Sequence, residues 1–145
     1  EEATQKLETV LKNGKALEIF STMVTKLEGP SDFCKNYENY LEKASIIKPI
    51  FAEKSGLIET IDTIALGMSV VGLGGGRLKP NDKIDHSVGL ENILGLGEKV
   101  DSKTPLMIIH AKNIDSFNEA KKRVLKAIEI GSKAPQIKEI YEIIS

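Results

Sequence analysis

The sequence predicts an α+β protein in which helices at the N-terminus precede a domain of short strands. Three observations support this fold class. Apolar residues recur at helical spacing over residues 1–45, and short β-rich runs bounded by Gly and Pro follow from Ser45 onward. Between these runs, residues 64–71 are apolar nearly all round, which is typical of a helix covered on most sides. We therefore expect one largely covered helix among short strands, with another helix near the C-terminus.

Residues 1–45 contain three predicted helices. Gly14 suits the position that ends the first, and Gly29-Pro30 closes the second. Ser31 is the predicted N-cap of the third. Short helices with thin apolar stripes bury little apolar surface by themselves, so we expect these helices to pack against another part of the protein. Where that part is missing, we expect their exposed apolar faces to favour self-association. Their apolar residues are Ala3, Leu7, Val10 and Leu11, then Ala16, Leu17, Phe20, Met23, Val24 and Leu27, then Phe33, Tyr37, Tyr40 and Leu41.

Two strands are predicted next. The first covers residues 46–51 and contains Pro49. Because proline cannot donate to a ladder, this is an edge strand or a strand with a break. Lys54-Ser55-Gly56 forms a turn, and the second strand covers residues 57–61.

The central helix begins at Asp62, a good N-cap that is flanked by apolar Ile61 and Leu66 at hydrophobic-staple positions. Gly67 and Gly72 each lower helix propensity by about 1 kcal/mol relative to Ala. We expect their compensation to be the close approach of a neighbouring backbone. A glycine cluster and Arg77 end the helix, and a polar surface loop follows from Lys79.

Residues 97–110 resemble the half-barrel hairpin of biotinyl and lipoyl carrier domains, with Val100 and Leu106 pointing inward on either side of a polar turn. Carrier domains present a lysine flanked by Met, or by Asp and Ala, and neither triplet occurs here. Further along, Ser116 is the predicted cap of a final helix that ends at Gly131, and residues 137–144 are expected to add a strand. The apolar face of that helix is formed by Phe117, Ala120, Val124, Ala127, Ile128 and Ile130.

Composition excludes several functional classes. The formal net charge is -1, from 20 basic and 21 acidic residues, so nucleic acid is not an expected partner. No apolar run reaches membrane-spanning length. The single Cys34 forms no internal disulfide, which favours a cytoplasmic protein. The chain begins within a predicted helix and without Met, so we expect a piece of a longer protein.

Chemically active residues are few. The run from Gly72 to Arg77 could cradle phosphate, but it follows a helix, whose C-terminal dipole repels anions, so a helix stop with a flexible link is the better interpretation. Asp82, Asp85 and His86 lack the spacing of a metal site, and a polar loop is favoured. His110 is interpreted as a hydrogen-bonded structural residue, and Cys34 as a structural thiol that is buried or half-buried.

A longer set of segments carries a family resemblance. These are Asn13-Gly14-Lys15-Ala16, Gly29-Pro30, Asp32-Phe33, Asp62-Thr63, Ala65-Leu66-Gly67-Met68, Val70-Val71, Leu73-Gly74-Gly75-Gly76-Arg77, Asp82, Ile84-Asp85, Ser87-Val88-Gly89, Leu96-Gly97, Pro105-Leu106 and Ile109-His110-Ala111. In order and spacing they resemble the C-terminal part of the thymidine phosphorylases, within the pyrimidine-nucleoside phosphorylase family.

The resemblance implies a homodimeric enzyme that cleaves thymidine with phosphate, giving thymine and 2-deoxyribose 1-phosphate. It places the phosphate- and pyrimidine-binding residues in the part of the enzyme that precedes this sequence. We therefore assign no catalytic, substrate-binding or metal-binding residue and no cofactor, and we expect the chain alone to be an inactive scaffold. Its partner would be the remainder of the phosphorylase chain.

For the fold, the resemblance implies that residues 1–45 end a central α/β domain and that residues 46–145 form the C-terminal domain, an α/β-hammerhead. It also places the loop of residues 74–79 towards the domain cleft, where it would influence closure. The alternative is a stand-alone carrier or binding module built on the same sandwich. Should the chain prove active alone, Arg77, Asp85, His86 and His110 are the residues to mutate.

Overall fold

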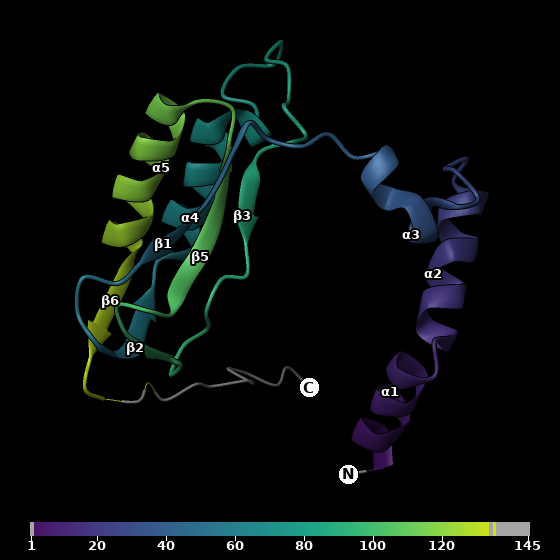
Figure 1. The fold of residues 1–145 in the computed structure, drawn as a ribbon, viewed down its shortest axis with the longest axis horizontal. Coiled ribbons are helices and arrows are strands. Elements are labelled where there is room, and N and C mark those ends of the chain that lie inside the picture. Colours follow the sequence, from purple (N-terminus) through teal and green to yellow (C-terminus); the bar gives the residue numbers. More distant parts are fainter. Residues whose placement is uncertain (1, 134, 136–145) are drawn as a thin grey trace, which may run out of the picture. The chain divides into compact units, whose positions relative to one another are not determined.

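The computed structural model describes residues 2–133 and 135 of the chain. Helices and two small antiparallel sheets make up this part, which confirms the predicted α+β class (Figure 1). The chain divides into two compact units, an N-terminal unit that ends at Glu42 and a C-terminal unit that begins at Lys43.

The N-terminal unit is helical and has no core of its own. It contains α1 (Glu2–Lys12), α2 (Lys15–Lys26), α3 (Phe33–Asn36) and the 3₁₀ turn η1 (Tyr37–Asn39). Gly14 separates α1 from α2 with a left-handed φ of 81°, as its predicted position at a helix end requires. No residue between 2 and 42 is buried, and apolar side chains of α2 such as Phe20 and Met23 are nearly half exposed.

The predicted cap at Ser31 is wrong. Asp32 stands at the N-cap position of α3, and its side chain makes no cap bond to the backbone. Its carboxylate instead accepts hydrogen bonds from the Tyr40 hydroxyl at 2.6 Å and from Nδ2 of Asn36 at 2.8 Å. The aspartate therefore ties the end of this short helical segment back to its start, which a serine hydroxyl is too short to do.

The strands of the C-terminal unit form two sheets. Sheet A has the order β1-β5-β3 and contains β1 (Ile46–Phe51), β5 (Pro105–Ala111) and β3 (Gly89–Glu91). Sheet B has the order β4-β2-β6 and contains β4 (Lys99–Val100), β2 (Gly56–Ile61) and β6 (Ile128–Gly131). Pro49 lies in β1, which is an edge strand, as the sequence predicted.

The predicted hairpin between Val100 and Leu106 is wrong in its pairing. Both side chains are buried, at 4% and 1% exposure, so their inward direction is confirmed. However, β4 pairs with β2 in sheet B, whereas β5 pairs with β1 and β3 in sheet A. The polar turn between them therefore crosses from one sheet to the other.

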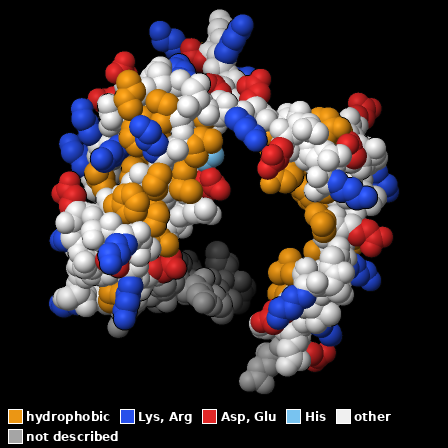
Figure 2. Space-filling view, in the orientation of Figure 1, with side chains coloured by type: hydrophobic (Ala, Val, Ile, Leu, Met, Phe, Trp, Pro, Cys, Tyr) orange, Lys and Arg blue, Asp and Glu red, His pale blue; other side chains and the backbone are white. Residues whose placement is uncertain are grey.

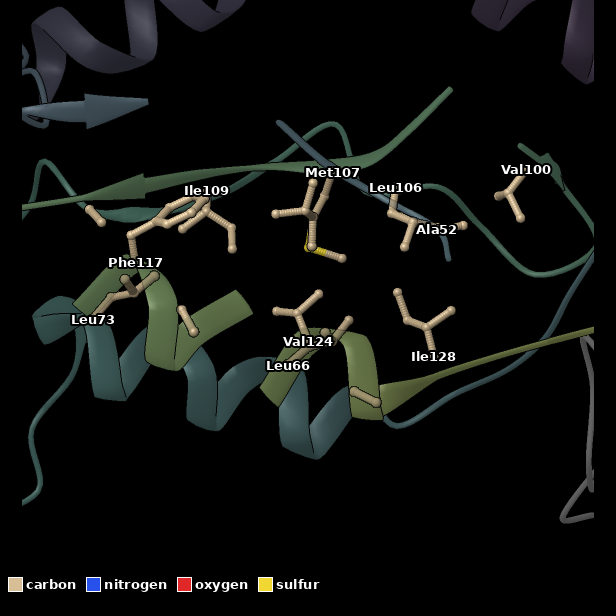
Figure 3. Packing of buried hydrophobic residues seen from close by; sticks show 14 of the residues in the cluster. Ala52, Leu66, Leu73, Val100, Leu106, Met107, Ile109, Phe117, Val124 and Ile128 are labelled. Atoms are coloured by element: carbon tan, nitrogen blue, oxygen red, sulfur yellow. The ribbon is translucent and has the colours of Figure 1, made fainter. Parts of the chain in front are cut away.

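The core lies between sheet A and a pair of helices. These are α4 (Thr63–Val70), which continues into the π-helical turn η2 (Val71–Gly75), and α5 (Ile114–Ala127). Figure 3 shows Met107 and Ile109 of β5 pointing at Phe117 and Val124 of α5, with Leu66 and Leu73 of the α4–η2 segment beside them. Asp62 caps α4 as predicted, since its carboxylate accepts a hydrogen bond from the Ala65 N–H at 2.9 Å.

The prediction that the central helix is covered on most sides is wrong for α4, as far as the described residues show. Only Leu66 and Ser69 of α4 are buried, while Ile64 is 79% exposed and Met68 44% exposed. The close backbone approach expected at the two glycines is also absent within the described part of the chain. A Cβ at Gly67 would meet nothing within 4 Å, and one at Gly72 would meet the Arg123 guanidinium at 3.6 Å. Helix α4 packs on α5 through one side only.

Helix α5 begins and ends earlier than predicted. Its N-cap is Asn113, which accepts a hydrogen bond from the Ser116 N–H at 2.9 Å, so Ser116 lies inside the first turn. The helix ends at Ala127, and Ile128 and Ile130 belong to β6, where they pair with Ile61 and Ile58 of β2. This pairing of β-branched residues overrides the helical spacing. The strand predicted at residues 137–144 lies outside the described residues.

Candidate functional site

The glycine run ends a helix, as predicted. Backbone geometry stays helical through η2 until Gly74, which has a φ of 107°. A residue other than glycine would be strained in this conformation. The Gly74 carbonyl accepts a hydrogen bond from the Asp85 N–H at 2.9 Å, so the following loop folds back onto the glycines. Because these glycines stand at the C-terminal end of α4, the helix dipole opposes an anion there.

The polar loop after the glycines is held by Asp82. One oxygen of its carboxylate accepts the N–H groups of Leu78 at 3.1 Å and Lys79 at 2.9 Å. Nε of Arg77 donates to the Asp82 carbonyl at 3.3 Å. These contacts are local, and they use Asp82 and part of Arg77 to shape the loop.

Asp85 is a structural carboxylate in this arrangement. It accepts hydrogen bonds from the hydroxyl of Ser87 at 2.6 Å and from the N–H of the same residue at 3.0 Å. The side-chain bond from Ser87 is the main reason that the pKa of Asp85 lies below its usual value, with smaller contributions from the charges of Lys112 and His86. A carboxylate held ionised in this way is a poor proton acceptor.

His110 and Cys34 are not part of the Asp82–His86 segment. Nε2 of His110 lies 2.7 Å from Oε2 of Glu91, across the β3–β5 pair, which confirms a hydrogen-bonded histidine. Cys34 lies in α3 of the N-terminal unit and is half-buried, as predicted. Within the described residues, no three or more His, Cys, Asp and Glu side chains cluster as metal ligands would, and no helix could span a membrane.

The turn that corresponds to a carrier's lysine hairpin is also shaped by an aspartate. The Asp101 carboxylate accepts the N–H groups of Lys103 at 2.8 Å and Thr104 at 2.6 Å. These backbone bonds lower the pKa of Asp101 below its usual value. Lys103 thus stands in a tight turn, but without the flanking residues that a carrier needs.

An open groove of about 940 Å³ lies in the C-terminal unit. It lies where the two sheets diverge, beside the C-terminal half of α5. Its apolar side chains are Ala52, Leu106, Leu125, Ile128 and Ile130, and its charged ones are Glu53, Lys54, Glu59, Lys122, Lys126 and Glu129. We call it the intersheet groove. Sequence reasoning missed it because its residues come from separate elements and share no motif.

A comparison with protein families bears on these features. The family described as Pyrimidine nucleoside phosphorylase C-terminal domain matches residues 57–131, just over half of the 145 residues. The chain belongs to this family. The matched span runs from β2 to β6, and so contains α4, the glycine run, the Asp85 loop and most of the intersheet groove.

Membership of the pyrimidine nucleoside phosphorylase C-terminal domain family confirms the expected relationship to a phosphorylase, a type of transferase. The name of the family describes one domain of a larger enzyme. Within the matched span, the carboxylates of Asp82, Asp85 and Asp101 each accept backbone N–H groups of a nearby turn.

Proposed function

We propose that this chain is the C-terminal structural domain of a thymidine phosphorylase. The whole enzyme would convert thymidine and phosphate to thymine and 2-deoxyribose 1-phosphate, as a cytoplasmic homodimer. The observation that carries the proposal is the family match over residues 57–131. That span includes the segments from Asp62 to Ala111 in which the sequence resembles the thymidine phosphorylases.

The chain alone is inactive in this proposal, and its partner is the remainder of the phosphorylase. Phosphorolysis needs groups that hold phosphate and stabilise charge as the glycosidic bond breaks. In the described residues, Arg77 and Lys79 contribute to a local turn with Asp82, and Asp85 is committed to Ser87. These contacts support a scaffold in which the substrates bind to the missing part.

The domain organisation follows from the same proposal. Residues 1–45 would end the central α/β domain, and residues 46–145 would form the C-terminal domain in a hammerhead arrangement. The absence of buried side chains between residues 2 and 42 supports a segment that needs another part of the enzyme to cover it. The loop of residues 74–79 would face the domain cleft and influence closure.

The test is thymidine phosphorolysis by the purified chain, first alone and then mixed with the complementary N-terminal part of a thymidine phosphorylase. We expect no thymine from the chain alone and recovery of activity on mixing. Activity of the chain alone would overturn the proposal, and Arg77, Asp85, His86 and His110 would then be mutated. Intact-mass analysis addresses the carrier alternative, since biotin or lipoate on a lysine would add a defined mass.

A further inference from the structure

We propose that Asn13-Gly14 is a site of spontaneous deamidation, at which the asparagine converts to aspartate and isoaspartate. The site lies in the turn between α1 and α2, and its only co-reactant is water. This inference concerns a covalent modification of the N-terminal unit and is independent of the phosphorylase activity.

The first argument is the residue that follows the asparagine. In deamidation, the backbone nitrogen of that next residue attacks the side-chain amide carbon, so a bulky next side chain hinders the attack. Gly14 has no side chain, and a Cβ at this position would meet nothing within 4 Å. The sequence contains no other Asn-Gly pair, because larger residues follow Asn36, Asn39, Asn81, Asn92, Asn113 and Asn118.

The second argument is the state of the attacking nitrogen. Among the described residues, no group accepts a hydrogen bond from the Gly14 N–H. On either side of it, the Asn13 N–H donates to the Thr9 carbonyl at 3.0 Å, and the Gly14 carbonyl accepts the Glu18 N–H at 3.0 Å. The Gly14 nitrogen therefore breaks no hydrogen bond with these residues when it loses its proton and attacks.

The third argument is the amide under attack. Oδ1 of Asn13 accepts a hydrogen bond from the Lys15 N–H at 3.0 Å. This bond draws electron density from Cγ and stabilises the negative charge that develops on Oδ1 during the attack. The leaving nitrogen, Nδ2, has no hydrogen bond within the described part of the chain. The turn thus polarises the carbonyl and leaves the departing group unhindered.

The surroundings of the turn are open to water. Asn13 and Gly14 are both exposed, and no residue between 2 and 42 is buried. Figure 2 shows hydrophobic and charged side chains next to one another on the surface of the unit that carries α1 and α2. Because both helices stop at this turn, its backbone can move towards ring closure without disturbing a packed core.

The reaction balances as the hydrolysis of one amide. The Gly14 nitrogen loses its proton to hydroxide and bonds to Cγ of Asn13, the Cγ–Nδ2 bond breaks, and Nδ2 takes up a proton and leaves as ammonia. Water then opens the five-membered succinimide. Attack at Cγ gives aspartate, whereas attack at the backbone carbonyl gives isoaspartate, whose main chain runs through Cβ and Cγ. The second product lengthens the link between α1 and α2 by one atom.

The experiment incubates the full chain in a mildly alkaline buffer and follows it by peptide mass spectrometry. Cleavage after glutamate releases Thr9–Glu18, which contains one asparagine and should become about 1 Da heavier. Asn113 is the internal control, since its Oδ1 also accepts an N–H, that of Ser116 at 2.9 Å, but Ile114 follows it. We expect Asn13 to react at least about tenfold faster than Asn113.

Two comparisons separate the parts of the argument. Gly14→Ala should slow the mass gain, because a methyl group then crowds the attacking nitrogen. A synthetic peptide of residues 9–18 has the same sequence without the folded turn, and the full chain should react within about tenfold of its rate. Equal rates at Asn13 and Asn113, an unchanged rate in Gly14→Ala, or a chain that stays intact while the peptide reacts would each overturn the inference. None of these results would affect the complementation test of the proposed function, which uses freshly prepared chain.

Discussion

Individual residues in this chain act mainly through short-range contacts with the backbone. Asp62, Asp82, Asp85 and Asp101 each accept N–H groups two to four residues further along or back, at a helix start or a turn. Asp62 and Asp101 could be suspected from the sequence, because Thr63 and Ser102 follow them directly. Whether a given glycine is required, by contrast, depends on its dihedral angles and neighbours.

Gly67 and Gly74 should respond to substitution in opposite directions. Gly67→Ala adds a methyl group in open space within α4, so the free energy of unfolding should rise by about 0.5–1 kcal/mol. Gly74→Ala places a side chain at a φ of 107°, which should cost about 1–2 kcal/mol. Urea denaturation of both variants provides the measurement. A loss of stability at Gly67 would mean that this position is covered.

The Asp85–Ser87 pair predicts a pH effect. Because Ser87 holds the pKa of Asp85 below its usual value of 3.8, the pair's contribution to stability is present above that value and is lost as pH falls through the lower, folded-state pKa. In Ser87→Ala, the pKa of Asp85 should rise towards its usual value, as followed by NMR titration of the carboxyl carbon. The pKa of Asp101 in the same sample should stay unchanged, and an unmoved Asp85 would contradict the assignment.

At the scale of elements, apolar spacing located the helices and strands, and pairing decided how they combine. Strands β1 and β2 and helices α1, α2 and α4 lie where the sequence predicted them. Ile128–Gly131 form a strand and not the end of a helix, because they pair with β2. Strands β4 and β5 lie in different sheets, because β4 also pairs with β2. In both cases the partner is distant in sequence. Spacing within one segment contains no information about such partners.

Two isoleucines of sheet A should differ in their importance. Ile109 of β5 is completely buried against the helices, whereas Ile47 of the neighbouring β1 is 47% exposed. We expect Ile109→Ala to lower the free energy of unfolding by about 2–5 kcal/mol, and Ile47→Ala by about 1 kcal/mol or less. Urea midpoints of the two variants give the comparison. Equal losses would indicate that the outer face of sheet A is covered in solution.

At the scale of the whole molecule, the two units differ in what they bury. The C-terminal unit encloses a continuous core that spans Ile50 to Ile128, while no described residue before Lys43 is buried. Helices of 11 and 12 residues are marginal in water without tertiary contacts. The N-terminal unit should therefore depend on other surfaces for its order.

Separate fragments test this difference. A peptide of residues 2–42 should be only weakly helical in dilute solution, whereas a protein of residues 43–145 should unfold cooperatively. Circular dichroism at 222 nm, followed through a urea titration, distinguishes the two. A strongly helical peptide that stays monomeric would contradict the prediction.

The sequence by itself determined the α+β class, the Asp62 cap and the glycine run that ends the central helix, because these depend on local spacing and residue type. Resemblance over many short segments indicated the relationship to phosphorylases. Only the tertiary structure decided which face of α4 is covered, that Gly67 meets open space, and that β6 lines a groove between the sheets. These features arise from contacts between segments far apart in the chain, whose geometry is set by packing rather than by any one stretch of sequence.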